Sequence, residues 1–388
     1  MYCPARSSKR AAQAGFTLIE LMIGVVIGLL ASLAVTHVLI ASEGNKRTTT
    51  SGSDAQVNGA LALGTLQRSV QQAGYGFGPV PAVVGCTLTA TFNGAAIPGF
   101  PTRLVPVQIT PNATVNMPDT IRVLASGKST FSMPIRVVTT YKKNDQLFQA
   151  ASGLGVAPPV TVGGVVKSPG DLMVVGVNTS TPCAMFQVTS QAANALDIKR
   201  EDDGAWNMAG TPPDNYAPGS FLINMGKPAD VTYSIVDNSL RASSLRIDTN
   251  TSAPSYDAAP VELFPNIVNL QAYYGKDTNG DGTVDAWNKT APTTNAEWLQ
   301  VIAVRIAVVS RSTQYEKDNV TNENLLWDIG AAVTVTGPAG AYTTEDCTLS
   351  GIATKCMRLK VDHLDDWKHY RYRVFDTVIP LRNMLWNS

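Results

Sequence analysis

The sequence predicts an α+β protein in which one long amino-terminal helix packs on a large, antiparallel, β-rich carboxyl-terminal domain. An uncharged run long enough to cross a membrane lies near the start of the chain, and an amphipathic stretch of helical period follows it. The rest of the 388 residues is rich in Thr, Val, Ser and Asn, and the whole chain holds 31 Gly and 23 Pro. This composition is typical of short strands joined by turns.

The uncharged run covers residues 21–41, a length of 21 residues. As a helix it spans about 31 Å, close to the hydrocarbon thickness of a bilayer. Arg6, Lys9 and Arg10 precede the run, and positive residues favour the cytoplasmic side of a membrane. We therefore expect a single membrane pass with the amino terminus in the cytoplasm.

A short motif lies where the polar leader meets this run. Its sequence is Gly-Phe-Thr-Leu-Ile-Glu-Leu-Met, with Gly15 before the apolar residues and Glu20 just inside them. A secretory signal would instead have its cleavage site after the apolar region. The motif resembles the processing site of type IV prepilins and of the related type II secretion pseudopilins. The resemblance implies that a membrane aspartyl peptidase cuts after Gly15 and methylates the new amine of Phe16.

Glu20 needs a physical explanation, because a charged residue at the centre of a membrane helix costs about 2.5–3.5 kcal/mol, and less near an end. In the family that Gly15–Glu20 resembles, the partner of this carboxylate is the amino-terminal amine of a neighbouring subunit. Glu20 would then set the register of assembly. The alternative is a plain signal anchor, in which Glu20 sits at the level of the lipid headgroups.

Residues 42–75 are expected to continue the helix in amphipathic form. Between residues 43 and 56, Gly44, Gly52 and three threonines lower the helix propensity, so the helix is expected to loosen there. Apolar residues then recur at helical spacing, and Gly74 is expected to end the helix. The residues expected to face the core are Val57, Leu61, Leu66, Val70 and Ala73. The stretch 66–75 resembles the end of the first helix in the PilW family of minor pilins.

The β-rich domain covers residues 76–388. Strands are expected at 120–124, 135–141, 172–177 and 231–235, separated by stretches rich in Pro, Gly, Asn and Asp. Further strands are expected at 267–274, 298–310 and 370–383. These last three, taken in order, again resemble PilW, so the resemblance covers residues 5–75 and 262–383.

The loop after the strand expected at 267–274 has a sequence that suggests a calcium-binding site. Oxygen-bearing side chains alternate along it and Gly282 occupies the sixth position, as in the first half of an EF-hand loop. The ligands would be the side chains of Asp277, Asn279 and Asp281, the backbone carbonyl of Thr283, and Asp285 directly or through water. The twelfth position is Asn288 instead of a bidentate Glu, so binding should be weak. Asn-Gly and Asp-Gly are also favoured hairpin turns, which is the plain alternative.

Five cysteines occur, and Cys3 lies in the leader. An even number outside the cytoplasm indicates two disulfides among the other four. The eight residues between Cys347 and Cys356 could form a hairpin loop, which favours this pair and hence the pair Cys86–Cys183. The thiols could also stay free; a zinc site is disfavoured because the sequence has no CxxC pair.

Charge and motifs exclude several classes of function. Thirty basic residues balance 30 acidic ones, and removal of residues 1–15 leaves 27 basic residues and a net charge of −3, so nucleic-acid binding is not indicated. The three histidines accompany no HExxH, GxSxG or nucleotide-binding glycine pattern. We expect the stretch 363–369 to be a solvated loop and not a metal site, and we expect no enzyme activity.

The resemblance implies a minor pilin of the bacterial inner membrane that then joins the pilus at the cell surface and helps to start type IV pilus assembly in a filament-tip complex. Its partners would be other minor and major pilins, the prepilin peptidase and the inner-membrane assembly machinery, with a tip adhesin as a further candidate. A minor pseudopilin would share the same residues, and a tip adhesin or DNA receptor would use residues 80–260. The expected segments are a prepilin leader (1–15), a transmembrane or filament-core helix (16–41), an amphipathic continuation (42–75) and a β-rich domain (76–388).

Overall fold

Helix α1 (Leu18–Gln72) opens the structure and contains 55 residues. The computed structural model describes residues 15–129, 132–191, 196–202, 205–247, 253–330, 334–336, 345–349 and 352–385. The chain forms two units, Met1–Ser53 and Asp54–Ser388, and α1 contributes to both.

Helix α1 is continuous across residues 43–56, so the expected loosening of the helix is absent. A Gly in a helix costs only about 1 kcal/mol, and a Thr less, which disfavours a helix without breaking it.

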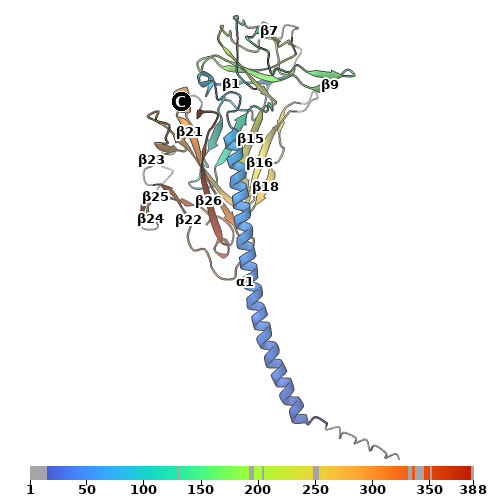
Figure 1. Ribbon diagram of the computed structural model, residues 1–388, viewed down its shortest axis with the longest axis vertical. Coiled ribbons are helices and arrows are strands. Elements are labelled where there is room, and N and C mark those ends of the chain that lie inside the picture. Colours follow the sequence, from blue (N-terminus) through green and yellow to red (C-terminus); the bar gives the residue numbers. More distant parts are fainter. Residues whose placement is uncertain are drawn as a thin grey trace, which may run out of the picture. The chain divides into compact units, whose positions relative to one another are not determined.

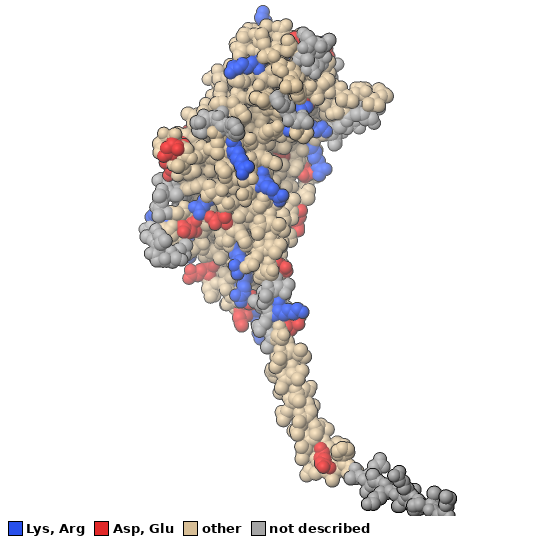
Figure 2. Space-filling view, viewed as in Figure 1, with Lys and Arg blue, Asp and Glu red and all other residues tan. Residues whose placement is uncertain are grey.

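In the amino-terminal unit, the first part of α1 is apolar and exposed. The segment Leu18–Ile40 contains 23 residues of mean hydropathy 2.5, and none of it is buried. Figure 2 shows its surface almost entirely in tan, whereas acidic and basic side chains are interspersed on the β-rich unit. By length and composition this segment can cross a membrane, and its exposed side chains need lipid or other helices around them.

In the carboxyl-terminal unit, α1 packs through one narrow face. The buried side chains of the helix recur at helical spacing and are Ala55, Ala62, Leu66 and Val70, and Ala73, directly after the helix, is buried as well. The prediction was wrong for Val57 and Leu61, which are 53% and 51% exposed. Small residues take their place at the contact: Gly59 lies against Phe375, so close that a Cβ atom on Gly59 would come within 2.3 Å of the ring. Hydrophobicity alone misled the prediction, because close approach of a helix requires small side chains.

This contact predicts opposite effects for two glycines of the same helix. Gly59→Ala should lower the free energy of unfolding by about 1 kcal/mol or more, because the Phe375 ring must move away and lose packing. Gly64→Ala should raise it by up to about 1 kcal/mol, because alanine favours the helix and no described side chain lies within 4 Å of the new methyl group. Urea unfolding of both variants, followed by tryptophan fluorescence, measures the difference. Equal effects would show that the Gly59–Phe375 contact does not constrain the helix.

The carboxyl end of α1 is capped as the sequence predicted. The helix ends at Gln72, and Gly74 adopts a left-handed backbone with φ of 75°. The Nδ2 of Asn383, near the other end of the chain, donates to the backbone oxygens of Gln72 and Ala73 at 3.3 and 3.0 Å. These bonds satisfy carbonyls that the helix itself leaves without a partner.

The largest hydrophobic core is lined by α1, by two large sheets and by one face of a third sheet. Figure 1 shows the carboxyl-terminal part of α1 among strands of the β-rich unit. The first sheet has the order β17-β16-β15-β5-β4, with β18 also paired to β16, and the second has the order β23-β20-β19-β21-β26. The strands of the first are β4 (Val107–Thr110), β5 (Thr120–Ala125), β15 (Ala229–Val236), β16 (Ser239–Arg246), β17 (Ser255–Tyr256) and β18 (Val261–Pro265). Those of the second are β19 (Ile267–Lys276), β20 (Ala286–Asn288), β21 (Val301–Arg311), β23 (Thr334–Thr336) and β26 (Tyr372–Pro380).

A third sheet, of order β1-β11-β10-β14-β6, borders a second core. In this core the Phe148 ring stacks between those of Tyr141 and Phe186, with centroids 4.0 and 4.8 Å away. The strands are β1 (Leu88–Thr89), β6 (Ile135–Arg136), β10 (Leu172–Gly176), β11 (Cys183–Gln187) and β14 (Phe221–Gly226). A smaller sheet beside it contains β7 (Leu147–Gln149), β12 (Ser190–Gln191) and β13 (Asp197–Lys199).

The remaining described elements are short. They are η1 (Pro81–Val83), β2 (Thr91–Phe92), β3 (Ala95–Ala96), β8 (Val160–Val162), β9 (Val165–Ser168), α2 (Asn295–Leu299), β22 (Leu325–Gly330), β24 (Glu345–Leu349), β25 (Ile352–Leu359) and η2 (Trp367–His369). The long strands pair antiparallel, and parallel pairing occurs for β1 with β11 and for β20 with β23. The α+β class and its antiparallel sheets are therefore confirmed.

Three predicted strands differ clearly from those observed, and one of them, expected at 370–383, is the shorter β26 (Tyr372–Pro380). The strand expected at 135–141 is β6, which covers only Ile135–Arg136. The strand expected at 298–310 begins at Val301, because Trp298 belongs to α2. There Thr294 and Glu297 form a capping box that starts a helix, a local signal that overrides the β propensity of the following residues.

Candidate functional site

The motif that is predicted to direct processing, Gly15–Met22, lies at the exposed start of α1. Thr17 precedes the first residue of α1, and its backbone N and Oγ1 donate to Glu20 Oε2 at 3.0 and 2.9 Å. In return the backbone N of Glu20 donates to Thr17 Oγ1 at 3.3 Å. These reciprocal bonds form a capping box, which satisfies free N–H groups at the helix start and holds the carboxylate there. Thr17 was not among the predicted site residues, although its spacing of three from Glu20 carries this signal.

Gly15 and Phe16 lie directly before this turn. Phe16 is 89% exposed, and no described atom lies within 4 Å of the position that a Cβ on Gly15 would occupy. The peptide bond between them is therefore unobstructed by the described part of the chain. Residues 1–14 of the predicted leader lie outside the described residues.

The predicted calcium ligands lie in one loop between β19 and β20, but their carboxylates serve as turn caps. Asp277 accepts hydrogen bonds from the backbone N of Asn279, Gly280 and Gly282, at 3.2, 2.6 and 2.8 Å. Asp285 accepts from the backbone N and Oγ1 of Thr278 at 2.7 and 2.8 Å. Within the described residues, no group of three or more His, Cys, Asp or Glu side chains is placed to hold a metal ion.

Asp281 is the most accessible test of the calcium hypothesis. It is exposed, and hydrogen bonds from Thr283 hold the pKa of its carboxyl below the usual range, so it is ionised at neutral pH. Calcium binding stays a prediction: we expect weak binding heat on titration of the protein with calcium chloride, lost in Asp281→Ala. No heat from the unmodified protein would leave the loop as a hairpin turn alone.

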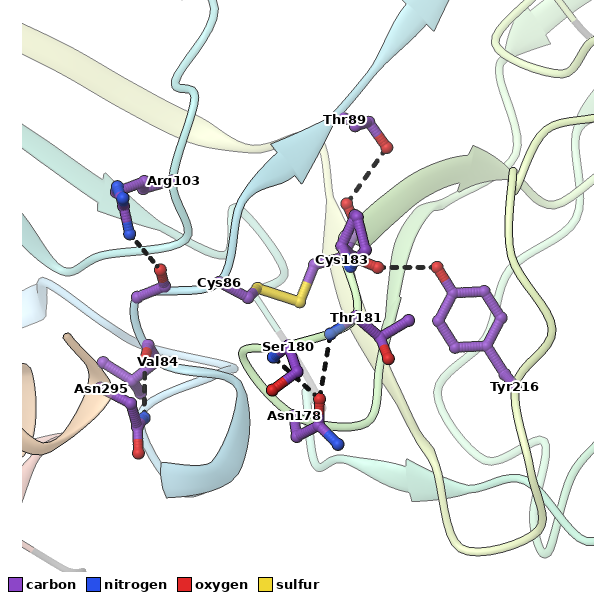
Figure 3. Close-up of a disulfide and its surroundings, with 12 residues drawn as sticks. Val84, Cys86, Thr89, Arg103, Asn178, Ser180, Thr181, Cys183, Tyr216 and Asn295 are labelled. Carbon is purple, nitrogen blue, oxygen red and sulfur yellow. Dashed lines mark hydrogen bonds between the residues drawn. A yellow bond between two sulfur atoms is a disulfide. The ribbon is translucent and has the colours of Figure 1, made fainter. Parts of the chain in front are cut away.

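Cys86 and Cys183 form a buried disulfide, with Cα atoms 5.9 Å apart (Figure 3). Cys86 follows η1, and Cys183 begins β11. Hydrogen bonds support both sides: Arg103 Nη1 donates to the backbone oxygen of Gly85 at 2.9 Å, and Thr89 Oγ1 donates to that of Cys183 at 3.2 Å. The disulfide thus anchors the third sheet to the segment that follows α1.

Cys347 and Cys356 form the second disulfide, also with Cα atoms 5.9 Å apart. It links β24 and β25, which pair antiparallel, so a hairpin joins the two cysteines as the sequence indicated. The favoured pairing of all four cysteines is confirmed, and Cys3 lies outside the described residues.

The sequence analysis did not identify a cluster of three buried polar residues. Lys289 contacts both Asp119 and Gln271, although Asp119 and Lys289 are 170 residues apart in the sequence. A single lysine two residues after Trp287 forms no motif that would mark it as buried. Only the pairing of β19 with β20, and their position beside Asp119, brings the three together.

Comparison with known proteins supports the resemblance at both ends of the chain. Residues 232–383 match the family model described as Type IV Pilus-assembly protein W, and residues 10–36 match the prokaryotic N-terminal methylation motif. The first match contains every strand of the second large sheet. Neither match extends over residues 66–75, where the sequence resemblance also lies.

Among solved structures, the chain is similar to a type IV-like pilin from Thermus thermophilus. The identity is 9% and the TM-score is 0.31, over 85% of this chain and 97% of that one. No curated protein matches the chain in sequence.

Proposed function

We propose that this chain, which matches the type IV pilus-assembly protein W model over residues 232–383 and the N-terminal methylation motif over residues 10–36, is a minor pilin that helps to start pilus assembly in a filament-tip complex. One observation carries the proposal: a processing motif directly precedes an exposed apolar helix of membrane-spanning length. Such a helix is stable in lipid or against similar helices. Assembly would move it from the first environment to the second.

Processing would prepare the helix for this transfer. Cleavage after Gly15 removes Arg6, Lys9 and Arg10, which would otherwise hold the amino terminus at the cytoplasmic face. The product starts at methylated Phe16 and keeps the apolar segment Leu18–Ile40 as its anchor. The body would lie in the periplasm, a location that agrees with its two disulfides, which persist in oxidising compartments.

Glu20 would set the register between subunits. In the single chain its carboxylate is bound by Thr17, at the first turn of the helix. An amino-terminal ammonium of a neighbouring subunit would give this carboxylate an opposite charge, which matters most where water is absent. Partners would be other pilins, major and minor, handled by the peptidase and the inner-membrane assembly machinery.

A second candidate function, a binding module at the filament tip, rests on the third sheet. One face of this sheet packs on the core around α1, and the other borders a second core, built from residues 135–222, that lies outside both family matches. A surface around this second core could carry adhesion without affecting assembly.

Deletion of the gene and complementation distinguish the two functions. If the protein starts assembly, the deletion strain loses most surface pili, and wild type restores them but Glu20→Ala does not. Membrane levels of the variant, measured by immunoblot, control for its stability. Normal pili with lost adhesion in the deletion strain would favour the binding module and contradict the assembly role.

A further inference from the structure

A lysine, a carboxyl group and a carboxamide meet in the dry interior between the two large sheets. Lys289 and Gln271 are 0% exposed and Asp119 is 1% exposed. Lys289 Nζ donates to Asp119 Oδ2 at 2.6 Å and also to Gln271 Oε1. Lys289 follows β20, Gln271 lies in β19, and Asp119 directly precedes β5.

The Gln271 carboxamide is held with its carbonyl facing the lysine. Its Nε2 donates to the backbone oxygen of Met117 at 2.7 Å and to Asn269 Oδ1 at 3.0 Å. Asp119 is held just as firmly, because its Oδ2 accepts from the backbone N of Ala272 at 3.0 Å. All three groups are therefore positioned before any reaction, the condition under which proximity lowers a barrier most.

Burial also changes the protonation of the pair. It raises the pKa of the Asp119 carboxyl and lowers the pKa of the Lys289 amine, because both charged forms lose water. Both shifts lower the cost of moving the proton from nitrogen to oxygen, a transfer that would give a neutral amine beside a neutral acid. A desolvated neutral lysine is a nucleophile, and a carboxylic acid is a proton donor.

We propose that Lys289 and Gln271 form an intramolecular isopeptide bond, with Asp119 as the proton relay. The Lys289 nitrogen attacks Cδ of Gln271, while the Asp119 acid protonates the carboxamide oxygen. Asp119 then takes a proton from the attacking nitrogen and passes it to Nε2, so that the Cδ–Nε2 bond breaks and Nε2 leaves as ammonia. The oxygen returns its proton to Asp119 as the carbonyl re-forms, which leaves Asp119 as the neutral acid with which the reaction began. One C–N bond replaces another, so the reaction needs no oxidant, reductant or cofactor.

The bond would link β19 to the residue that follows β20, across the loop that contains Asp277. It would be a third covalent cross-link in the same chain, and reduction would not break it as it breaks the disulfides. A reduced filament subunit would thus retain one covalent link within its second large sheet.

Mass spectrometry of the full-length protein, purified from membranes in detergent and reduced, tests the proposal. We expect an intact mass one ammonia lower than the sequence of the mature chain requires. Trypsin does not cut after an acylated lysine, so digestion should release residues 247–276 joined to residues 277–305. Fragmentation of that product should place the link between Gln271 and Lys289.

Substitutions test whether the cross-link requires the side chains of Lys289 and Asp119. Lys289→Arg and Asp119→Ala should restore the full mass and the cut after residue 289, whereas Lys142→Arg, at an exposed position, should keep the cross-link. Should the two core variants fail to fold, the peptides of the wild-type protein still decide the question. A free peptide 277–289 in the wild type overturns the proposal. Loss of water with residues 104–122 attached to Lys289 also overturns it, because the bond would then join Lys289 to Asp119.

Discussion

Replacing Gly15 with valine is expected to leave the leader on essentially all of the protein. A peptidase that accepts glycine before the scissile bond need not accommodate a branched side chain. Within the described part of this chain, nothing lies within 4 Å of the new Cβ atom, so the substitution leaves the protein's own packing unchanged. Intact mass and amino-terminal sequencing of protein from cells that contain the prepilin peptidase measure the effect.

Gly24→Ala is the matched control for Gly15→Val. It also adds a side chain where no described atom lies within 4 Å, but inside the apolar segment and away from the scissile bond. This control should be processed like the wild type, to a chain that starts at methylated Phe16, and only when the peptidase is present. A normally processed Gly15→Val protein would contradict the assignment of the cleavage site. A wild-type chain that stays uncut in cells with the prepilin peptidase as well as in cells without it would remove the main support for the proposed pilin function.

The second large effect concerns the disulfide Cys86–Cys183. Its cysteines are 97 residues apart in the sequence, and in the chain-entropy model closing such a loop contributes about 4.7 kcal/mol to the free energy of unfolding. Changing both cysteines to alanine should therefore leave much of the protein unfolded or degraded. Urea unfolding monitored by tryptophan fluorescence, with membrane levels measured by immunoblot, gives the size of the loss.

The Cys347–Cys356 disulfide provides an internal control for that measurement. Its cysteines are only 9 residues apart, and the same model predicts about 2.6 kcal/mol for its removal. The double variant at 86 and 183 should thus be the less stable by about 2 kcal/mol. Equal losses would indicate that local packing around each disulfide, and not closure of the longer loop, determines its contribution.

The features closest to function were readable from the sequence because they are local. The motif at Gly15–Glu20 and the apolar segment after it depend on neighbouring residues and on lipid, so they need no tertiary partner for their recognition. The pair Cys347–Cys356 followed from the same logic, since a hairpin joins the two cysteines. Long β-prone runs predicted strands at 267–274 and 370–383, and the structure has strands at Ile267–Lys276 and Tyr372–Pro380.

Tertiary structure decided what depends on contacts between distant residues. Val57 and Leu61 have the spacing of a buried face, yet the close approach of Phe375 to Gly59 turns them outward. Asp119, Gln271 and Lys289 carry no motif, and only the folded sheets bring them into one dry site. A sequence reports the preferences of each residue and its neighbours, whereas burial and proximity arise from the packing of segments that lie far apart in the chain.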